Sequence, residues 1–401
     1  MEYAIRQSEA IAREGVEVYF LCKSSFPFER LADGIKVREF NKSRGPSDQS
    51  RGLTEKILRG LRMISDLRSE AKHVVKLAYQ LSQNTSTRHQ LPATRHNLGE
   101  AEVAVLFACY KEYFAPFWVW PLRRLARRGV VVGTIAHDPV RDFVVGPLWW
   151  HRWSVRLGYS FVRHVFVHDD TPVDFGGKQP EGIAVHQIPF GAYPLSPPRG
   201  GREEVRNRFG FANSDIVFFA FGQIRDGKNL DLFLRAMTKL PENVKLLVAG
   251  KGHSGSSKPP EFYQDLAEEL GVAERCRFEI RRIPDEEVGE LFNAIDFTLL
   301  TYSAKFRSMS AVLATALTAR KPVLASSGPG PLKTVVEKYH LGVFVKPDDA
   351  EEILRGASKL VTSFATGKCE FELQPEWERY ERENSWKENA SQVACKMFMI
   401  S

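Results

Sequence analysis

The chain has 401 residues, of which 43% are hydrophobic and 26% are charged, and its formal net charge is +7. This length has room for two domains of ordinary size, and the composition is that of a globular protein, not a disordered one. The positive charge indicates an anionic partner: a nucleotide diphosphate, an anionic membrane surface or nucleic acid. Because no nucleic-acid-binding motif is present and basic residues cluster beside aromatic ones, a membrane surface or a lipid-linked substrate is favoured over nucleic acid.

Cysteine usage and hydropathy give expectations about the compartment. The five cysteines show no metal-binding spacing: Cys22, Cys109, Cys276, Cys369 and Cys395. This scatter is typical of a reducing compartment, with neither a zinc site nor a disulfide framework. The sequence contains no apolar stretch of about 20 residues and no signal peptide. We therefore expect a cytoplasmic protein without a bound metal.

The first half of the chain predicts alternating helices and strands. Helices are expected over 1–13, 53–82 and 121–128, and strands over 16–21, 35–40, 103–107, 130–135, 164–170 and 185–191. Basic residues on the helix over 53–82 suit either lipid headgroups or a solvated face above the sheet. The aromatic and basic segment 142–153 is interpreted either as an acceptor wall or membrane contact, or as tryptophans that pack a helix.

Two polar groups follow predicted strands of this half. His137 comes directly after the strand over 130–135, and a histidine at the carboxyl end of a parallel strand can hydrogen-bond a hydroxyl or a reacting oxygen. The alternative is a loop histidine that caps the next turn. Asp169 and Asp170 form the acidic end of another predicted strand, and 170–172 more readily begins a turn or helix than binds a metal.

The second half has a stronger alternation of strands and helices. An unbroken apolar run over 216–221 is typical of a strand covered on both faces, and it leads into a glycine loop with two cations, Arg225 and Lys228. Further strands are expected over 244–249, 277–280, 297–300, 322–325 and 342–345, and helices over 230–237, 261–270, 285–292 and 311–319. The alternation predicts the α/β class with a parallel, doubly wound sheet and right-handed crossovers.

Composition also indicates the domain boundaries. A stretch rich in proline and glycine, with a short helix after it, occupies 194–212 and is typical of an interdomain linker. The prediction is thus a first domain over 1–193, a second over 213–374, and terminal helices over 375–401.

The ordered motifs of the second half resemble those of family 4 glycosyltransferases. They are the glycine loop with Lys228, the Gly250-Lys251-Gly252 turn, the Asp285-Glu286-Glu287 helix start, the small-residue helix, Lys321-Pro322-Val323 and the glycine turn 327–330. The resemblance covers 213–362, and more loosely 134–140, 188–193 and Ser385-Trp386. It implies the GT-B fold, in which two Rossmann-like domains face a cleft and the terminal helices cross back to the first domain. The first strand and glycine turn of that fold are expected to be absent here, because the chain starts inside the pattern.

The resemblance also implies roles for the cleft residues. Lys228 stands where the family binds the donor diphosphate, and His137 stands where it addresses the sugar. Gln223, after Gly222, replaces the usual arginine, and Arg225 is the nearest substitute. Cations and helix N-termini at this point would stabilise the negative charge of a departing pyrophosphate.

The donor loop departs further from the family. When the chain is aligned with the family on Lys321-Pro322-Val323, Arg307 and Thr315 stand at the positions of the two usual glutamates. Arg307 could add charge while the helix start offers amides and hydroxyls to the diphosphate; the residues concerned are Ser308, Ser310 and Ala311. Gly250 and Gly252 permit close backbone approach or a plain turn, and Arg281 and Ile283 lie where the family reads the base.

We therefore expect a retaining, metal-independent glycosyltransferase that moves a sugar from a nucleotide-diphosphate sugar to a polysaccharide or lipid-linked acceptor. No further cofactor is expected, and peripheral contact with the inner face of an anionic membrane is expected. The alternative from another class is an inactive homologue that acts as a binding or scaffold protein. A nucleotide-dependent oxidoreductase or epimerase is disfavoured because no GxGxxG follows a first strand.

Overall fold

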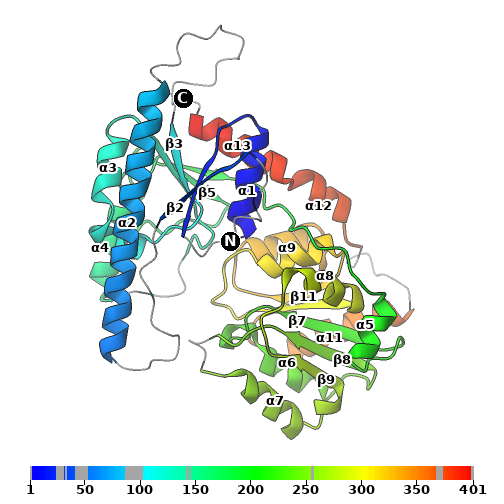
Figure 1. The fold of residues 1–401 in the computed structure, drawn as a ribbon. Helices are drawn as coiled ribbons and strands as arrows, with labels where there is room; N and C mark the ends of the chain where they lie inside the picture. Colours follow the sequence, from blue (N-terminus) through cyan, green and yellow to red (C-terminus); the bar gives the residue numbers. More distant parts are fainter. Residues whose placement is uncertain are drawn as a thin grey trace. The chain divides into compact units, whose positions relative to one another are not determined.

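The computed structural model describes residues 2–23, 31, 34–40, 53–85, 103–140, 144, 146–253, 257–366 and 374–398. The chain forms two compact units (Figure 1). One comprises Met1–Pro189 with Ser385–Ser401, and the other Phe190–Asn384. The division falls within the predicted first domain, near its end, and the proline-rich stretch with its short helix belongs to the second unit. Of the two terminal helices, the first belongs to the second unit and the last to the first unit.

The first unit contains two parallel sheets. One has the order β3-β4-β5-β6, and the other pairs β1 with β2. Its elements are α1 (Glu2–Arg13), β1 (Tyr19–Lys23), β2 (Lys36–Phe40), α2 (Leu53–Thr85), β3 (Ala104–Phe107), the 3₁₀ turn η2 (Glu112–Phe117), α3 (Trp120–Ala126), β4 (Val131–Ile135), α4 (Leu148–Tyr159), β5 (His164–Val167), β6 (Ala184–Gln187) and α13 (Trp386–Phe398). Gly133 of β4 lets α13 approach, because a Cβ atom there would lie 2.5 Å from the Met397 sulfur.

The second unit is a six-stranded parallel sheet with the order β12-β11-β10-β7-β8-β9. Its elements are α5 (Arg202–Arg208), β7 (Ile216–Phe221), η3 (Asp226–Lys228), α6 (Leu230–Met237), β8 (Val244–Ala249), α7 (Pro260–Glu269), η4 (Ala273–Arg275), β9 (Cys276–Glu279), α8 (Asp285–Ala294), β10 (Phe297–Thr301), α9 (Ala311–Thr318), β11 (Val323–Ser326), α10 (Pro331–Lys338), β12 (Gly342–Phe344), α11 (Ala350–Thr366) and α12 (Trp377–Glu383). The strand order reverses between β7 and β10, and such a switch point is where open parallel sheets bind ligands.

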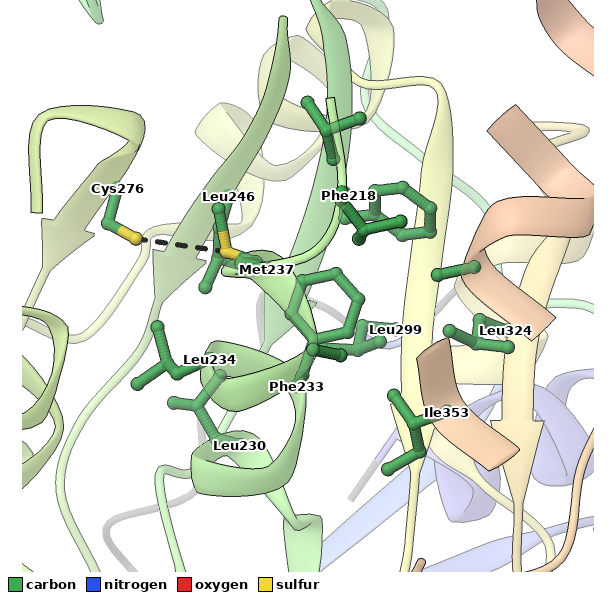
Figure 2. Packing of buried hydrophobic residues seen from close by; sticks show 14 of the residues in the cluster. Phe218, Leu230, Phe233, Leu234, Met237, Leu246, Cys276, Leu299, Leu324 and Ile353 are labelled. Carbon is green, nitrogen blue, oxygen red and sulfur yellow. Dashed lines mark hydrogen bonds between the residues drawn. The ribbon is translucent and has the colours of Figure 1, made fainter. Parts of the chain in front are cut away.

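Strand β7 explains how this sheet is covered on both faces. Alternate residues of a strand point to opposite faces, so Ile216 and Phe218 join the core formed with α6, α7 and α11, whereas Phe219 contacts Phe292 of α8. Figure 1 shows α6 and α7 on one side of the sheet, and α8 and α9 on the other. Figure 2 shows Phe233 of α6 against Phe218, with 5.1 Å between the ring centroids. The sheet that carries the loops after β7 and β10 is therefore covered on both faces.

Candidate functional site

A small cavity lies at the switch point of the second unit. Its residues come from the ends of β7, β8 and β10 and from the loops that follow β7 and β10: Ala220, Gly222, Gln223, Ile224, Arg225, Lys228, Leu230, Val248, Leu299, Thr301 and Tyr302. The enclosed volume of about 10 Å³ holds roughly one water molecule. Apolar side chains make up most of the lining of this recess, and the predicted residues Gly222, Gln223, Arg225 and Lys228 meet there.

Lys228 is the central cation of this recess. Its Nζ atom donates a hydrogen bond to the Phe221 carbonyl oxygen at 2.5 Å. A Cβ atom on Gly222 would lie 3.6 Å from Lys228 Nζ and 3.7 Å from a methyl group of Val312, so Gly222 separates the ammonium group from the first turn of α9. Burial, followed by the positive charge of Arg225, lowers the pKa of Lys228 to about 7. An anion bound here would favour the charged form of the lysine.

The loop that carries Lys228 is fastened to the loop after β10. The Thr301 hydroxyl donates to the Lys228 carbonyl at 3.0 Å, and the Ser303 amide donates to the Gly227 carbonyl at 3.0 Å. Asp348 strengthens the link, because its carboxylate accepts from the Asn229 side chain and from the Ala304 amide, each at 2.9 Å. The position of Lys228 is thus set before any ligand arrives.

Gly250 and Gly252 bring the turn after β8 against the same loop. Gly250 has φ +152°, and a Cβ atom there would lie 2.0 Å from the Gly222 carbonyl oxygen. Gly252 pairs with Ile224 in an isolated parallel bridge. Close backbone approach therefore explains Gly250, whereas a Cβ atom on Gly252 would lie 2.8 Å from a ring carbon of Pro260. Their contact with a ligand stays a prediction.

The start of α9 is held by side chains of its own loop. Ser310 caps the helix by accepting from the Leu313 amide at 3.3 Å, and its hydroxyl lies 3.0 Å from the Tyr302 hydroxyl. The Tyr302 ring stacks on Phe306 with 4.1 Å between centroids, and burial raises the pKa of Tyr302. The Ser310 hydroxyl is thus engaged in the capping, whereas Ala311 is exposed at the helix start.

The remaining predicted donor residues are not part of this recess. Arg281 is held by two carboxylates, at 3.1 Å to Glu279 and 2.6 Å to Glu287, and Ile283 is buried. The Thr315 hydroxyl donates to the Ala311 carbonyl within α9 at 3.1 Å. Ser308 is half-buried, and Arg307 is exposed in the wall of a second pocket. No described residue of the recess other than Arg225 and Lys228 carries a positive charge.

In the first unit, His137 lies after the carboxyl end of β4 and stacks beside His168, which follows β5. Their ring centroids are 5.4 Å apart, and His137 Nδ1 lies 3.3 Å from His168 Nε2. His168 Nδ1 lies 3.4 Å from the Ile188 carbonyl oxygen, which can only accept. A proton on His168 Nδ1 therefore leaves its Nε2 atom to accept from His137. Burial, followed by the nearby His137 charge, lowers the pKa of His168 to about 3.

Tyr3 of α1 supports this histidine pair. The Tyr3 ring meets the His137 ring edge-on at 4.5 Å between centroids, and the Tyr3 hydroxyl accepts from the Asn389 side chain at 3.0 Å. Asn389, on α13, also donates to the Pro189 carbonyl at 2.7 Å and accepts from Gln7 at 3.0 Å. The two ends of the chain thus position His137 within the first unit.

His168, Tyr3 and Asp348 were missed as positioning residues by the sequence reasoning. A signal existed for His168: β4 and β5 pair in parallel with Ile135 opposite Phe166, so the residues two positions beyond meet at the same sheet edge. No comparable signal marks Tyr3 or Asp348, since their partners are distant in sequence. Among the described residues, no cluster of three or more His, Cys, Asp or Glu side chains is placed to hold a metal.

The sequence family described as "Glycosyl transferases group 1" matches residues 201–383. This segment is a group 1 glycosyltransferase domain. A relative named D-inositol 3-phosphate glycosyltransferase, from Stackebrandtia nassauensis, is 28% identical over 211 residues. That alignment covers 51% of this chain and 46% of the relative, so the match spans about half of each protein.

Solved structures extend the likeness from the glycosyltransferase domain to both units. Sucrose-phosphate synthase from Thermosynechococcus elongatus has a TM-score of 0.63 at 14% identity, covering 98% of this chain and 90% of that one. HepE from Anabaena, in complex with UDP and glucose, has a TM-score of 0.64 at 15% identity, covering 99% and 95%. At such identities the likeness concerns the fold. The predicted class, α/β with two Rossmann-like units as in GT-B proteins, is confirmed.

Proposed function

We propose that this chain transfers a sugar from a nucleotide-diphosphate sugar to a polysaccharide or lipid-linked acceptor. The observation that carries the proposal is the meeting of Lys228, Gly222 and the first turn of α9 at the switch point of a group 1 glycosyltransferase domain. When the bond between sugar and diphosphate breaks, negative charge gathers on the leaving pyrophosphate. A cation beside a helix N-terminus stabilises that charge where it develops.

The finer assignments belong to the same proposal. Arg225 assists Lys228 at the diphosphate, and His137 addresses the sugar from its place after β4. The reaction proceeds with retention, as the resemblance implies. It needs no metal, because the cations supply the charge stabilisation. The UDP and glucose in the HepE structure and the name of the inositol phosphate relative support a nucleotide-sugar donor.

The acceptor side is proposed to involve an anionic membrane surface. In the first unit, α4 exposes Leu148, Trp149 and Trp153, and 67% of Trp149 is exposed. Tryptophan beside basic residues suits the boundary between water and lipid headgroups. No helix of the described residues is long and apolar enough to cross a membrane. Contact at the inner face of the membrane by a cytoplasmic protein is the form that we propose.

Nucleotide titration tests the donor site. UDP and GDP are titrated into the full chain by calorimetry, with Lys228→Ala beside Lys239→Ala, a surface lysine that is 59% exposed and paired with Glu351. Loss of a charge-assisted contact is expected to weaken binding of the preferred nucleotide by about tenfold to a hundredfold in Lys228→Ala. Lys239→Ala should bind as the wild type does. Equal affinities for all three proteins would contradict the proposal.

An inactive, nucleotide-binding homologue is the second candidate. It rests on the resemblance, in which Arg307 and Thr315 stand at the positions of the family's two glutamates. In its support, Arg307 lies outside the recess and the Thr315 hydroxyl bonds within its own helix. The two candidates differ in turnover. Release of UDP or GDP from the bound nucleotide sugar, in the presence of membrane lipid extracts, supports the transferase. Tight donor binding without release supports the inactive homologue.

A further inference from the structure

A second and larger pocket of the same unit has no part in the donor site described above. Its volume is about 540 Å³, which lies within the range of small-molecule sites. It is formed by the loops after β10, β11 and β12 together with α10 and α11; its lining residues are Ala304, Arg307, Ser327, Gly328, Pro329, Lys333, Phe344, Val345, Lys346, Pro347 and Arg355. None of these residues lines the recess of Lys228. We call this hollow the basic pocket.

The charge of the basic pocket has one sign. Four of its lining residues are cations, namely Arg307, Lys333, Lys346 and Arg355, and none of the lining residues is acidic. The four cations come from four separate elements, so the fold gathers them there at a cost in mutual repulsion. Such a cluster at the carboxyl ends of parallel strands favours an anion of more than one charge.

Two of these cations have loosely held carboxylate partners. Lys346 pairs with Asp349 at 3.8 Å and Lys333 with Glu337 at 3.9 Å, whereas Arg355 makes two hydrogen bonds to Glu352, at 2.7 and 3.3 Å. Each partner lies three or four residues away and outside the lining. Exposed pairs of this kind contribute little to stability and can yield to a ligand. Arg307 has no ion-pair partner among the described residues.

The walls of the basic pocket are rigid. Gly328 donates from its amide to the Phe306 carbonyl at 3.0 Å, and a Cβ atom there would lie 2.2 Å from the Ala304 carbonyl oxygen. The loops after β10 and β11 are therefore in close backbone contact. Asp348 anchors Ala304 from the loop after β12. A preformed site of this kind spends little binding energy on ordering its own loops.

The lining also has an apolar surface that could contact the uncharged part of a ligand. The Lys333 ammonium lies 5.7 Å from the centre of the Phe344 ring, and Pro329 and Pro347 are apolar neighbours in the lining. A phosphate alone fills only a small part of the volume. The guanidinium groups of Arg307 and Arg355 match the oxygens of a phosphate geometrically.

We propose that the basic pocket binds a small phosphomonoester, of the size of a phosphorylated sugar, at a site separate from the nucleotide. The phosphate lies among Lys333, Lys346, Arg355 and Arg307, and the sugar-sized body lies over Phe344. This site does not depend on the transfer reaction, since its residues and its ligand are defined without the donor.

Calorimetry on the full chain at low salt tests the site, with glucose 6-phosphate, inorganic phosphate and glucose as probes. Wild-type protein is expected to bind glucose 6-phosphate more tightly than phosphate, and not to bind glucose. The double variant Lys333→Gln/Arg355→Gln should bind glucose 6-phosphate at least about tenfold more weakly. Lys346→Gln, in which a side chain that is 73% exposed changes, should weaken it in the same direction without affecting folding. Lys239→Gln should bind as the wild type does.

Three outcomes would overturn the proposal. One is that the double variant and the wild type bind glucose 6-phosphate with equal affinity, or that neither protein binds it. Another is binding only to vesicles of phosphatidylcholine with phosphatidic acid, which would make the patch a lipid contact. The third is a loss of UDP affinity in the double variant as large as its loss of glucose 6-phosphate affinity, which would make the pocket part of the donor site. Absence of UDP binding to every protein would instead contradict the proposed function and leave the glucose 6-phosphate result to decide this one.

Discussion

The protonation of Lys228 is the residue-scale feature with the clearest consequence. Its pKa is lowered to about 7 by burial and by Arg225. A diphosphate that binds beside it favours the ammonium form, so above about pH 7 a proton must be taken up with the ligand. UDP affinity should therefore fall as the pH rises from about 7 to 9, approaching tenfold per pH unit. Calorimetry across this range measures the slope.

Lys228→Arg is the matched variant for this slope. Arginine remains charged at these pH values, so no proton has to be taken up at this position. Its UDP affinity should change less with pH than that of the wild type. The same slope in both proteins would show that another group accounts for the pH dependence.

The histidine pair gives a second expectation at this scale. Burial lowers the folded-state pKa of His168 to about 3, below its value of 6.5 when unfolded, so the unfolded chain binds more protons between these values. This group's contribution to stability is therefore present above about pH 6.5 and is lost as the pH falls toward 3. His168→Gln, which does not titrate, should lose less stability than the wild type between about pH 6.5 and 4.5.

Denaturant unfolding at several pH values measures this difference, and His253→Gln, at an exposed position, is the control. Nitrogen-15 spectra provide a direct check, because the His168 ring should remain neutral at about pH 5. A charged His168 ring at that pH would contradict the geometry in which its Nε2 atom accepts from His137.

Residue-scale prediction from the sequence succeeded where position within a strand is enough. His137 follows β4 as expected, and Gly222, Arg225 and Lys228 follow β7 and meet in one recess. The sequence did not reveal that Arg307 would line the basic pocket, because that depends on how the loop after β10 folds against the loop after β11. Roles toward a ligand remain predictions for all of these residues.

At the scale of elements, the central core of the second unit explains the stability of the switch point. Phe233 of α6 has no exposed surface and packs against Phe218 of β7. Phe233→Ala removes these contacts and leaves a cavity, so we expect a loss of about 3–5 kcal/mol in unfolding free energy. Phe364→Ala, at a ring that is 51% exposed, should cost much less. Chemical denaturation measures both, and equal losses would contradict the description of this core.

The agreement between predicted and observed elements follows the burial of each strand. The strands over 216–221 and 244–249 are observed at those residues, because buried parallel strands form unbroken apolar runs. The strand predicted over 16–21 is found at Tyr19–Lys23, paired only with β2, in which Lys36, Arg38 and Glu39 are exposed, so the apolar signal is weaker. Helices α10 and α11 were not predicted. Helix α10 begins with a proline directly after a glycine turn, so its start was interpreted as part of the turn.

At the scale of the whole molecule, the last helix belongs to the first unit. Asn389 of α13 is fully buried and bonds to Tyr3, Gln7 and the Pro189 carbonyl. Asn389→Leu removes these three hydrogen bonds, although Gln7 Nε2 keeps its bond to the Tyr3 hydroxyl at 3.3 Å, so we expect a loss of about 1–3 kcal/mol in unfolding free energy. Hydrogen exchange should therefore accelerate in β4, beside His137, while β7 of the second unit keeps its protection. Unchanged exchange in β4 would show that α13 does not support the histidine pair.

The most direct test of the account is a crystal structure of the chain with UDP. A diphosphate oxygen is expected to lie about 3 Å from Lys228 Nζ, with the phosphates facing Gly222 and the first turn of α9. Phosphates bound in the basic pocket among Lys333, Lys346 and Arg355, with the recess at Lys228 unoccupied, would contradict it.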